Sequence, residues 1–195
     1  MRLRIFLVCV VLVFLMSACV PSTNVTHADT PPCYGPGIIK EGEADVFNRN
    51  FNTDSEQADY IFEQIINALE NKDALALKAL FSDSTVASIG NFEEDIHTLV
   101  NFYEGEMVFY KRYGPGSHAY KEGTTQAKDI FASFDITTNL TKYRLAIRFC
   151  AVDSEKPENI GLYSLYIIKA ENSDLAFAYW GNDVWNVGIN IEDNT

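Results

Sequence analysis

The sequence predicts an α+β fold in which helices precede an antiparallel sheet. The first observation is a helical period in the apolar residues from about residue 54 to residue 103. The second is a change of that period to two from residue 106 onward, which is typical of strands. Because the two kinds of element are segregated along the chain, we expect a helical hairpin and a third helix packed on a curved sheet of four to six strands.

The first predicted helix begins after Thr53, because Thr53 and Glu56 have the spacing of a capping box. Its apolar residues form one stripe of helical period: Ile61, Phe62, Ile65, Ile66 and Leu69. The segment Asn71-Lys72-Asp73 ends this helix, and Asp73 can cap a second, short helix that completes the hairpin.

Two further boundaries complete the helical part. The second helix carries the apolar residues of 75–81 and ends at Ser82-Asp83-Ser84. A third helix spans about residues 92–103, with its apolar side chains on one side, and Gly105 stops it.

Five segments after residue 106 predict strands: 107–110, 124–138, 142–152, 160–170 and 184–191. Gly114-Pro115-Gly116 predicts a turn after the first strand. The third strand alternates most regularly and places Arg144 and Arg148 on one face. The expected order is an antiparallel meander.

The N-terminus has the organisation of an export signal. Arg2 and Arg4 precede an unbroken apolar run over residues 5–16. This run is too short to span a bilayer, which takes about 20 residues. Residues 20–37 are rich in Pro, Thr, Ser and Gly, which is typical of a tether. We therefore divide the chain into a signal peptide over 1–18, a tether over 19–53 and an α+β domain over 54–195.

The segment Leu15-Met16-Ser17-Ala18-Cys19 resembles the lipobox of bacterial lipoproteins. This resemblance implies that Cys19 is diacylated and becomes the first residue of the mature protein. The lipid on Cys19 would then hold the protein on the cell membrane, facing outside the cytoplasm.

The domain resembles the nuclear-transport-factor-2-like (cystatin-like) cone and an uncharacterised family of Gram-positive lipoproteins that contains it. The segments that carry the resemblance are Asn71-Lys72-Asp73, Leu80-Phe81-Ser82, Tyr143-Arg144-Leu145, the run 159–165 and a Trp-containing C-terminal segment. The resemblance covers residues 54–191 in outline. It implies a bent sheet that wraps a long helix and leaves an open-ended pocket, it leaves a homodimer through the sheet face open, and it brings no established activity.

Composition excludes one class of partner. The net charge of −12 becomes −14 when residues 1–18 are removed, because Arg2 and Arg4 leave with the signal and no acidic residue does. Such an acidic surface repels phosphates, so we expect no nucleic acid partner. The acidity serves either solubility or attraction to a basic partner.

Two cysteines remain once Cys9 has left with the signal and Cys19 carries lipid. Cys33 lies in a Pro/Gly loop and Cys150 lies in a predicted strand. Outside the cytoplasm a Cys33–Cys150 disulfide is permitted, and the alternative is two separate thiols.

Candidates for catalysis are few. His118 follows the predicted Gly-Pro-Gly turn, in a loop at the expected mouth of the cone. Asp129 and Asp135 lie on a predicted strand and could point inward. Enzymes on the fold that this chain resembles, such as ketosteroid-isomerase-like ones, use a carboxylate base in an apolar pocket. No nucleophile elbow, phosphate-binding glycine loop or metal motif is present, so we expect no cofactor and no metal.

Candidates for binding are two pairs of side chains. Arg144 and Arg148 are ~13 Å apart along one strand, so they either pair with acids on neighbouring strands or form an anion-recognising patch. Trp180 and Trp185 flank a turn that could close the open end of the cone, contact a protein or pack in the core.

Three functions follow from these observations. The first is a non-enzymatic module that binds a small molecule or a protein, which predicts a pocket without converging polar groups. The second is an isomerase- or dehydratase-like enzyme, which needs a buried acid or histidine with a hydrogen-bond partner in the pocket. The third is an immunity-type protein that captures a basic toxin, which needs acids concentrated on one face.

Overall fold

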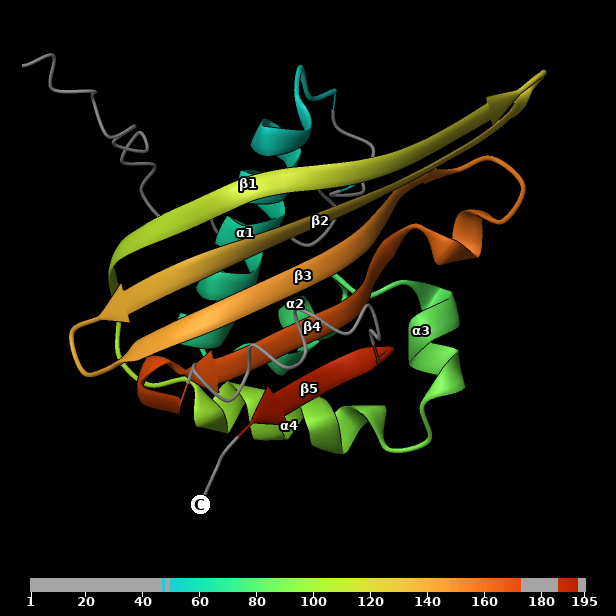
Figure 1. The fold of residues 1–195 in the computed structure, drawn as a ribbon. Coiled ribbons are helices and arrows are strands. Elements are labelled where there is room, and N and C mark those ends of the chain that lie inside the picture. Colours follow the sequence, from blue (N-terminus) through green and yellow to red (C-terminus); the bar gives the residue numbers. More distant parts are fainter. Residues whose placement is uncertain (1–46, 48–49, 173–185, 193–195) are drawn as a thin grey trace, which may run out of the picture. The chain divides into compact units, whose positions relative to one another are not determined.

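The computed structural model describes residue 47, residues 50–172 and residues 186–192. All of them lie in the second of two compact units, Pro36–Thr195. The helices are α1 Asp54–Glu70, α2 Ala74–Lys78, α3 Asp83–Ser88 and α4 Phe92–Phe102. The strands are β1 Met107–Glu122, β2 Thr125–Thr138, β3 Lys142–Asp153, β4 Gly161–Lys169 and β5 Gly188–Glu192, with the 3₁₀ turns η1 Pro157–Asn159 and η2 Ala170–Asn172 (Figure 1).

The fold is α+β, as the sequence predicted: helices pack on an open sheet of order β1-β2-β3-β4-β5. Strands β1 to β4 form the expected antiparallel meander. The last strand departs from the expectation, because β5 pairs parallel to β4, with Gly188 opposite Ser164. A hydrogen bond of 2.8 Å from the Ser164 hydroxyl to the Asn186 carbonyl holds this register. No helix within the described ranges is long and apolar enough to cross a membrane.

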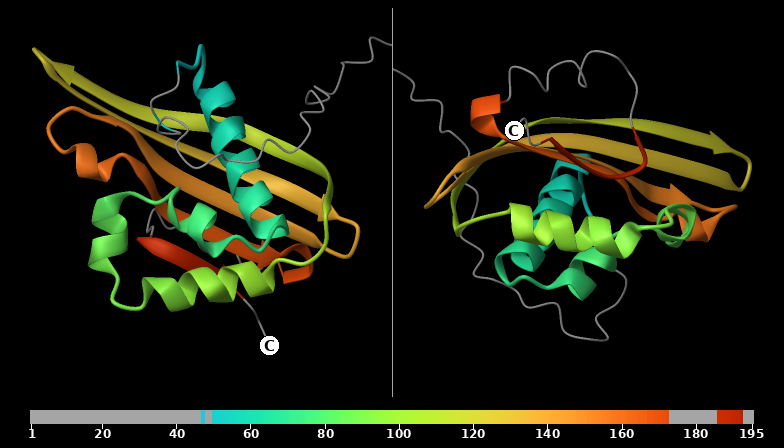
Figure 2. Two further views of the ribbon diagram at one scale, coloured as in Figure 1. Left: turned by 180° about the vertical axis from the view of Figure 1, so that it is seen from behind. Right: turned by 90° about the horizontal axis from the view of Figure 1, so that it is seen from below.

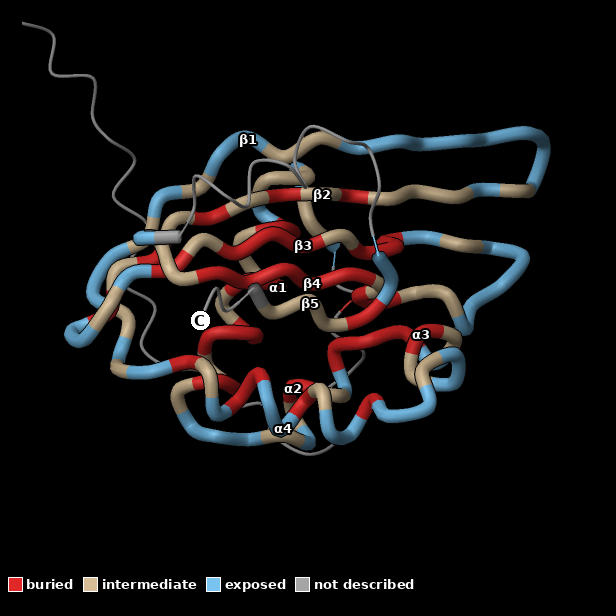
Figure 3. The backbone as a smooth tube through the Cα atoms, turned by 60° about the horizontal axis from the view of Figure 1, so that its bottom comes forward, coloured by how far each residue is buried: buried red, intermediate tan, exposed pale blue. Residues whose placement is uncertain are grey.

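The hydrophobic core fills the space between α1 and the sheet. The N-terminus of α1 has the predicted cap, since the Glu56 N–H donates to Thr53 Oγ1 at 3.1 Å. Phe62 of α1 stacks on Phe134 of β2, with ring centroids 4.0 Å apart. Buried residues run along the middle strands and the helical stripe (Figure 3). We call the face of the sheet that turns away from α1 the outer face (Figure 2).

The segment Ser82-Asp83-Ser84 has a second role that the sequence analysis missed. It ends α2 as expected, but it also begins α3, so the described part of the chain has four helices and not three. The cause is local: Ser82 caps the new helix by accepting a hydrogen bond of 3.2 Å from the Thr85 N–H. Since α3 is only one and a half turns long, it has no apolar stripe to reveal it.

The predicted turn at Gly114-Pro115-Gly116 is wrong, because β1 runs through it to Glu122. The pairing of β1 with β2 shifts between Tyr113 and Gly116, which marks a bulge on an edge strand. Such a position tolerates proline, since its missing N–H removes no ladder bond. Gly116 leaves room for an aromatic ring, as a Cβ there would lie 1.9 Å from Cζ of Phe131.

Gly161 allows a close contact between the helical part and β4. Its φ of +132° lies in a region that glycine occupies and L side chains avoid. A Cβ at this position would lie 2.6 Å from the backbone nitrogen of Ser82. The contact is fastened on both sides, because the Ser82 N–H donates to the Leu162 carbonyl and the Leu162 N–H donates to the Leu80 carbonyl, at 2.9 and 2.8 Å. The start of α3 is thereby fixed beside β4.

Candidate functional site

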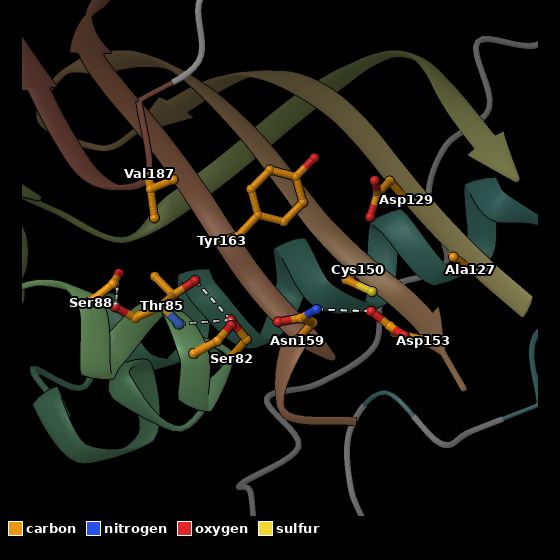
Figure 4. A pocket seen from close by; sticks show the side chains of 11 residues that line it. Ser82, Thr85, Ser88, Ala127, Asp129, Cys150, Asp153, Asn159, Tyr163 and Val187 are labelled. Carbon is orange, nitrogen blue, oxygen red and sulfur yellow. Dashed lines mark hydrogen bonds between the residues drawn. The ribbon is translucent and has the colours of Figure 1, made fainter. Parts of the chain in front are cut away.

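A pocket of about 430 Å³ lies where the outer face of β2, β3 and β4 meets α3 and η1. In Figure 4 the side chains of Asp129 and Tyr163 stand on the side of the strands away from α1. The lining residues are Ser82, Ser84, Thr85, Ser88, Ala127, Asp129, Cys150, Asp153, Asn159, Tyr163 and Val187. This pocket does not lie in the interior of a cone, where a pocket was expected, but on the opposite face of the sheet.

Hydroxyl groups form the wall that α3 contributes. The Ser82 hydroxyl donates to Thr85 Oγ1 at 2.8 Å, and the Ser88 hydroxyl donates to the Thr85 carbonyl at 2.8 Å. The first bond holds the Thr85 side chain while its own O–H proton stays available, since a hydroxyl both accepts and donates. This wall is polar.

Asp153 and Asn159 form the wall beside η1. The Asp153 carboxylate accepts hydrogen bonds from Asn159 Nδ2 at 2.9 Å and from the Lys156 N–H at 2.8 Å. These bonds, that from Asn159 first, hold the pKa of Asp153 below its ordinary value. Asp153 is thus committed to ordering the loop, and it orients the Asn159 amide at the pocket (Figure 4).

Asp129 is the other lining carboxylate, and it does not order a loop as Asp153 does. It lies opposite Cys150 in the β2–β3 ladder. Burial raises the pKa of Asp129, and the Cys150 thiol and the charges of His118 and Arg148 offset this only in part. No ion pair within 4 Å joins Asp129 to a cationic side chain in the described ranges. A desolvated carboxylate without an ion pair costs stability.

The pH dependence of stability should reveal this cost. A raised pKa means that the folded state binds the Asp129 proton more tightly than the unfolded state does, so stability falls as pH rises above the ordinary value of 3.8 toward the folded value. We expect Asp129→Asn to remove that slope and to stabilise the protein at neutral pH by less than about 1 kcal/mol, because the group keeps contact with solvent. Urea unfolding at a series of pH values measures this.

Asp135→Asn is the matched control on the same strand and should act in the opposite direction. Burial raises the pKa of Asp135, but the hydrogen bonds from Arg144 and Tyr113 outweigh it and hold the pKa below its ordinary value. The ionised form therefore stabilises the fold above that value, so this variant should be less stable at neutral pH. An unchanged pH slope in Asp129→Asn would contradict the assignment.

Cys150 is buried and has no disulfide partner within the described residues. Burial, and next the nearby Asp129 carboxylate, raise the pKa of its thiol to about 11. The Sγ donates to the Val152 carbonyl at 3.3 Å. A thiol with this pKa stays protonated at neutral pH, so Cys150 is not an activated nucleophile. Cys33, its predicted disulfide partner, lies outside the described residues, so the pairing stays a prediction.

The other catalytic candidates do not enter the pocket. His118 lies on β1 opposite Asp129 and is exposed, so its predicted place in a loop is wrong: β1 continues through the bulge that was taken for a turn. Its ring is 5.8 Å from that of Phe131. Asp135 forms an ion pair with Arg144, 2.8 Å from Nε, and does not point inward to the core. Of the three candidates, Asp129 alone lines the pocket.

The predicted binding residues do not form one site within the described residues. Arg144 pairs with an acid of the neighbouring strand, the first of its two predicted roles. The Arg148 guanidinium lies over the Phe131 ring, 5.5 Å from its centroid. Trp180, Trp185 and the lipidation candidate Cys19 lie outside the described residues. Sequence reasoning missed the α3 hydroxyls, for which the only signal was the Ser/Thr content of 82–88, and it did not assign Asn159 or Tyr163 to a site.

The fold and site define an α+β protein with a pocket on the outer face of its sheet, lined in part by polar side chains. The chain belongs to the DUF5104 family, described as a domain of unknown function, whose model matches residues 64–170. The matched region contains every lining residue except Val187. A search of curated proteins found no match. The family description gives no function, which is consistent with the uncharacterised family that the sequence resembles.

Proposed function

We propose that this protein is an extracytoplasmic lipoprotein, anchored by lipid on Cys19, whose domain binds a small polar molecule in the outer-face pocket. The observation that carries the proposal is the convergence of hydroxyl, amide and carboxylate groups in one pocket of about 430 Å³. This volume lies within the usual range for small-molecule sites, roughly 300–1,000 Å³. The convergence of polar groups departs from the expectation for a binding module, which was a pocket without them.

Binding is favoured over catalysis because most of the titratable groups near Asp129 are held protonated, lie outside the lining or already accept hydrogen bonds. The Cys150 thiol is held protonated, and His118 is exposed on β1. Asp153 accepts backbone and amide hydrogen bonds that occupy its oxygens. General acid–base chemistry needs two groups with complementary protonation states. Among the described lining residues Asp129 has only the Tyr163 phenol as such a partner, and burial raises the pKa of that phenol.

An isomerase- or dehydratase-like enzyme is the second candidate, and one observation favours it. Asp129 is a partly buried carboxylate with a raised pKa, the property expected of a general base. In this alternative Tyr163, whose pKa burial also raises, would be the hydrogen-bond donor. A substrate that Asp129→Asn still binds but no longer converts would identify the enzyme.

The relation to the nuclear-transport-factor-2-like cone is also part of the proposal. The support is the four-stranded meander β1 to β4, which crosses α1 on its core face. In this proposal the pocket has moved from the interior, which core side chains fill, to the outer face.

A pocket-filling substitution tests the binding function. Ala127→Trp places an indole in the pocket lining, whereas Ala119→Trp places the same indole on the exposed end of β1, outside the lining. Polar metabolites that raise the melting temperature of the wild-type chain should fail to do so for Ala127→Trp and should still do so for Ala119→Trp. If the two variants respond alike, the pocket is not the binding site.

A further inference from the structure

We infer that the ligand of this pocket is a small hydroxylated organic cation, of which an amino sugar is the simplest example. The inference rests on the proposed function and adds the chemical class of the ligand. In this arrangement the ligand's ammonium group lies against the Asp129 carboxylate, and its hydroxyl groups bind the side chains of α3 and η1.

The charges of the lining point to a cation. Of the eleven lining residues, two are charged at neutral pH, Asp129 and Asp153, and both are negative. Asp153 is occupied by the loop that it orders. The titratable groups that face Asp129 are His118 from β1, Arg148, Cys150 and Asp153 from β3, and Tyr163 from β4. None of the described cations comes within 4 Å of Asp129, so its carboxylate remains open to an ammonium group.

The remaining lining groups suit hydroxyl partners. Thr85 can donate its O–H, because it accepts from Ser82 and holds its rotamer through that bond. The Asn159 side chain uses its Nδ2 on Asp153, which leaves its amide oxygen as an acceptor. Both groups are uncharged, and both form hydrogen bonds with alcohols: the Thr85 hydroxyl donates and the Asn159 amide oxygen accepts. A ligand hydroxyl therefore finds a donor on the α3 wall and an acceptor beside η1.

Tyr163 supplies the apolar part of the site. Its ring stands between the α3 wall and Asp129 (Figure 4). An aromatic face packs against the carbon skeleton of a cyclic ligand while polar groups around it fix the orientation. The combination of one aromatic face, one open carboxylate and a ring of uncharged hydrogen-bonding groups fits a hydroxylated ring that carries an amine.

A matched panel of three sugars tests the inference. Glucosamine, glucose and glucuronate share one ring and differ in carrying a positive charge, no charge and a negative charge. Isothermal titration of the full chain at about pH 6.5, where an amine of this type is protonated, should give glucosamine roughly tenfold tighter binding than glucose. Glucuronate should bind most weakly.

Two isosteric variants assign that preference to one carboxylate. Asp129→Asn should bind glucosamine and glucose equally. Glu158→Gln removes the same charge from the exposed η1 turn, outside the lining, and should keep the tenfold preference. The wild-type preference should also weaken as pH falls toward the pKa of Asp129, because the protonated carboxyl no longer attracts an ammonium group.

The outcomes separate this inference from the proposed function. Equal binding of glucosamine and glucose by the wild type, or a preference that Asp129→Asn retains, overturns the inference while sugar binding itself still supports a ligand pocket. Tightest binding of glucuronate overturns it as well. If no sugar binds, the inference fails, and the proposed function is then decided by the two tryptophan variants with other polar metabolites.

Discussion

Gly161→Ala is expected to destabilise the domain by about 3 kcal/mol, because it combines backbone strain with a steric clash. A φ of +132° is strained for any residue with a Cβ. The new methyl group would lie 2.6 Å from the Ser82 nitrogen and 2.9 Å from its Cα, and a backbone cannot swing aside as a side chain can. For a chain of this size the expected loss in melting temperature is roughly 6–12 °C.

Gly114→Ala is the matched control for that variant. It adds the same methyl group on β1, where a Cβ would meet nothing within 4 Å. Its effect should stay within about 0.5 kcal/mol, as for most surface substitutions. Thermal unfolding of both variants decides the matter, and equal melting temperatures would show that the segment 80–82 does not pack on β4 as closely as described.

Gly161→Ala should also weaken the binding of any ligand in the pocket. The contact that Gly161 permits fixes Ser82, and Ser82 begins the hydroxyl wall of α3. A backbone shift at this point moves Thr85 relative to Asp129, since the first lies on α3 and the second on the sheet. The fold and the site thus both depend on the absence of a side chain at Gly161.

Cys19→Ala is expected to abolish lipid labelling completely. Diacylation requires the thiol of this residue, so cells fed radioactive palmitate should label the wild-type protein and not the variant. Cys33→Ala is the control, because it removes a neighbouring thiol and should keep the label. Label on Cys19→Ala, or mature wild-type protein that retains residues 1–18, would contradict the lipoprotein proposal.

The parts of the fold that local sequence determines were predicted well. The cap at Thr53, the stripe of α1 and the regular alternation of β3 each depend on residues within a few positions of one another. The passage of β1 through Gly114-Pro115-Gly116 was missed, because it depends on pairing with β2 and on room for the Phe131 ring. The parallel β5 was missed for the same kind of reason, since its register is fixed by Ser164.

The interactions of the site residues were predicted only where pairing with a neighbouring strand determines them. The pairing of Arg144 with an acid across the sheet follows from strand geometry, and the structure gives Asp135. Asp129 was a candidate because it lies on a strand, but nothing local distinguished it from Asp135. The walls of the pocket come from α3 and η1, and their place beside Tyr163 depends on the close approach at Gly161. Such a contact between distant segments leaves no periodic signal in the sequence.

Ligand binding in the outer-face pocket is tested most sharply by titrating glucosamine into the two tryptophan variants. We expect Ala127→Trp to give no binding heat, because the indole occupies the pocket, and Ala119→Trp to bind as the wild type does. Binding of glucosamine by Ala127→Trp with wild-type affinity would contradict the assignment of the ligand to the outer-face pocket.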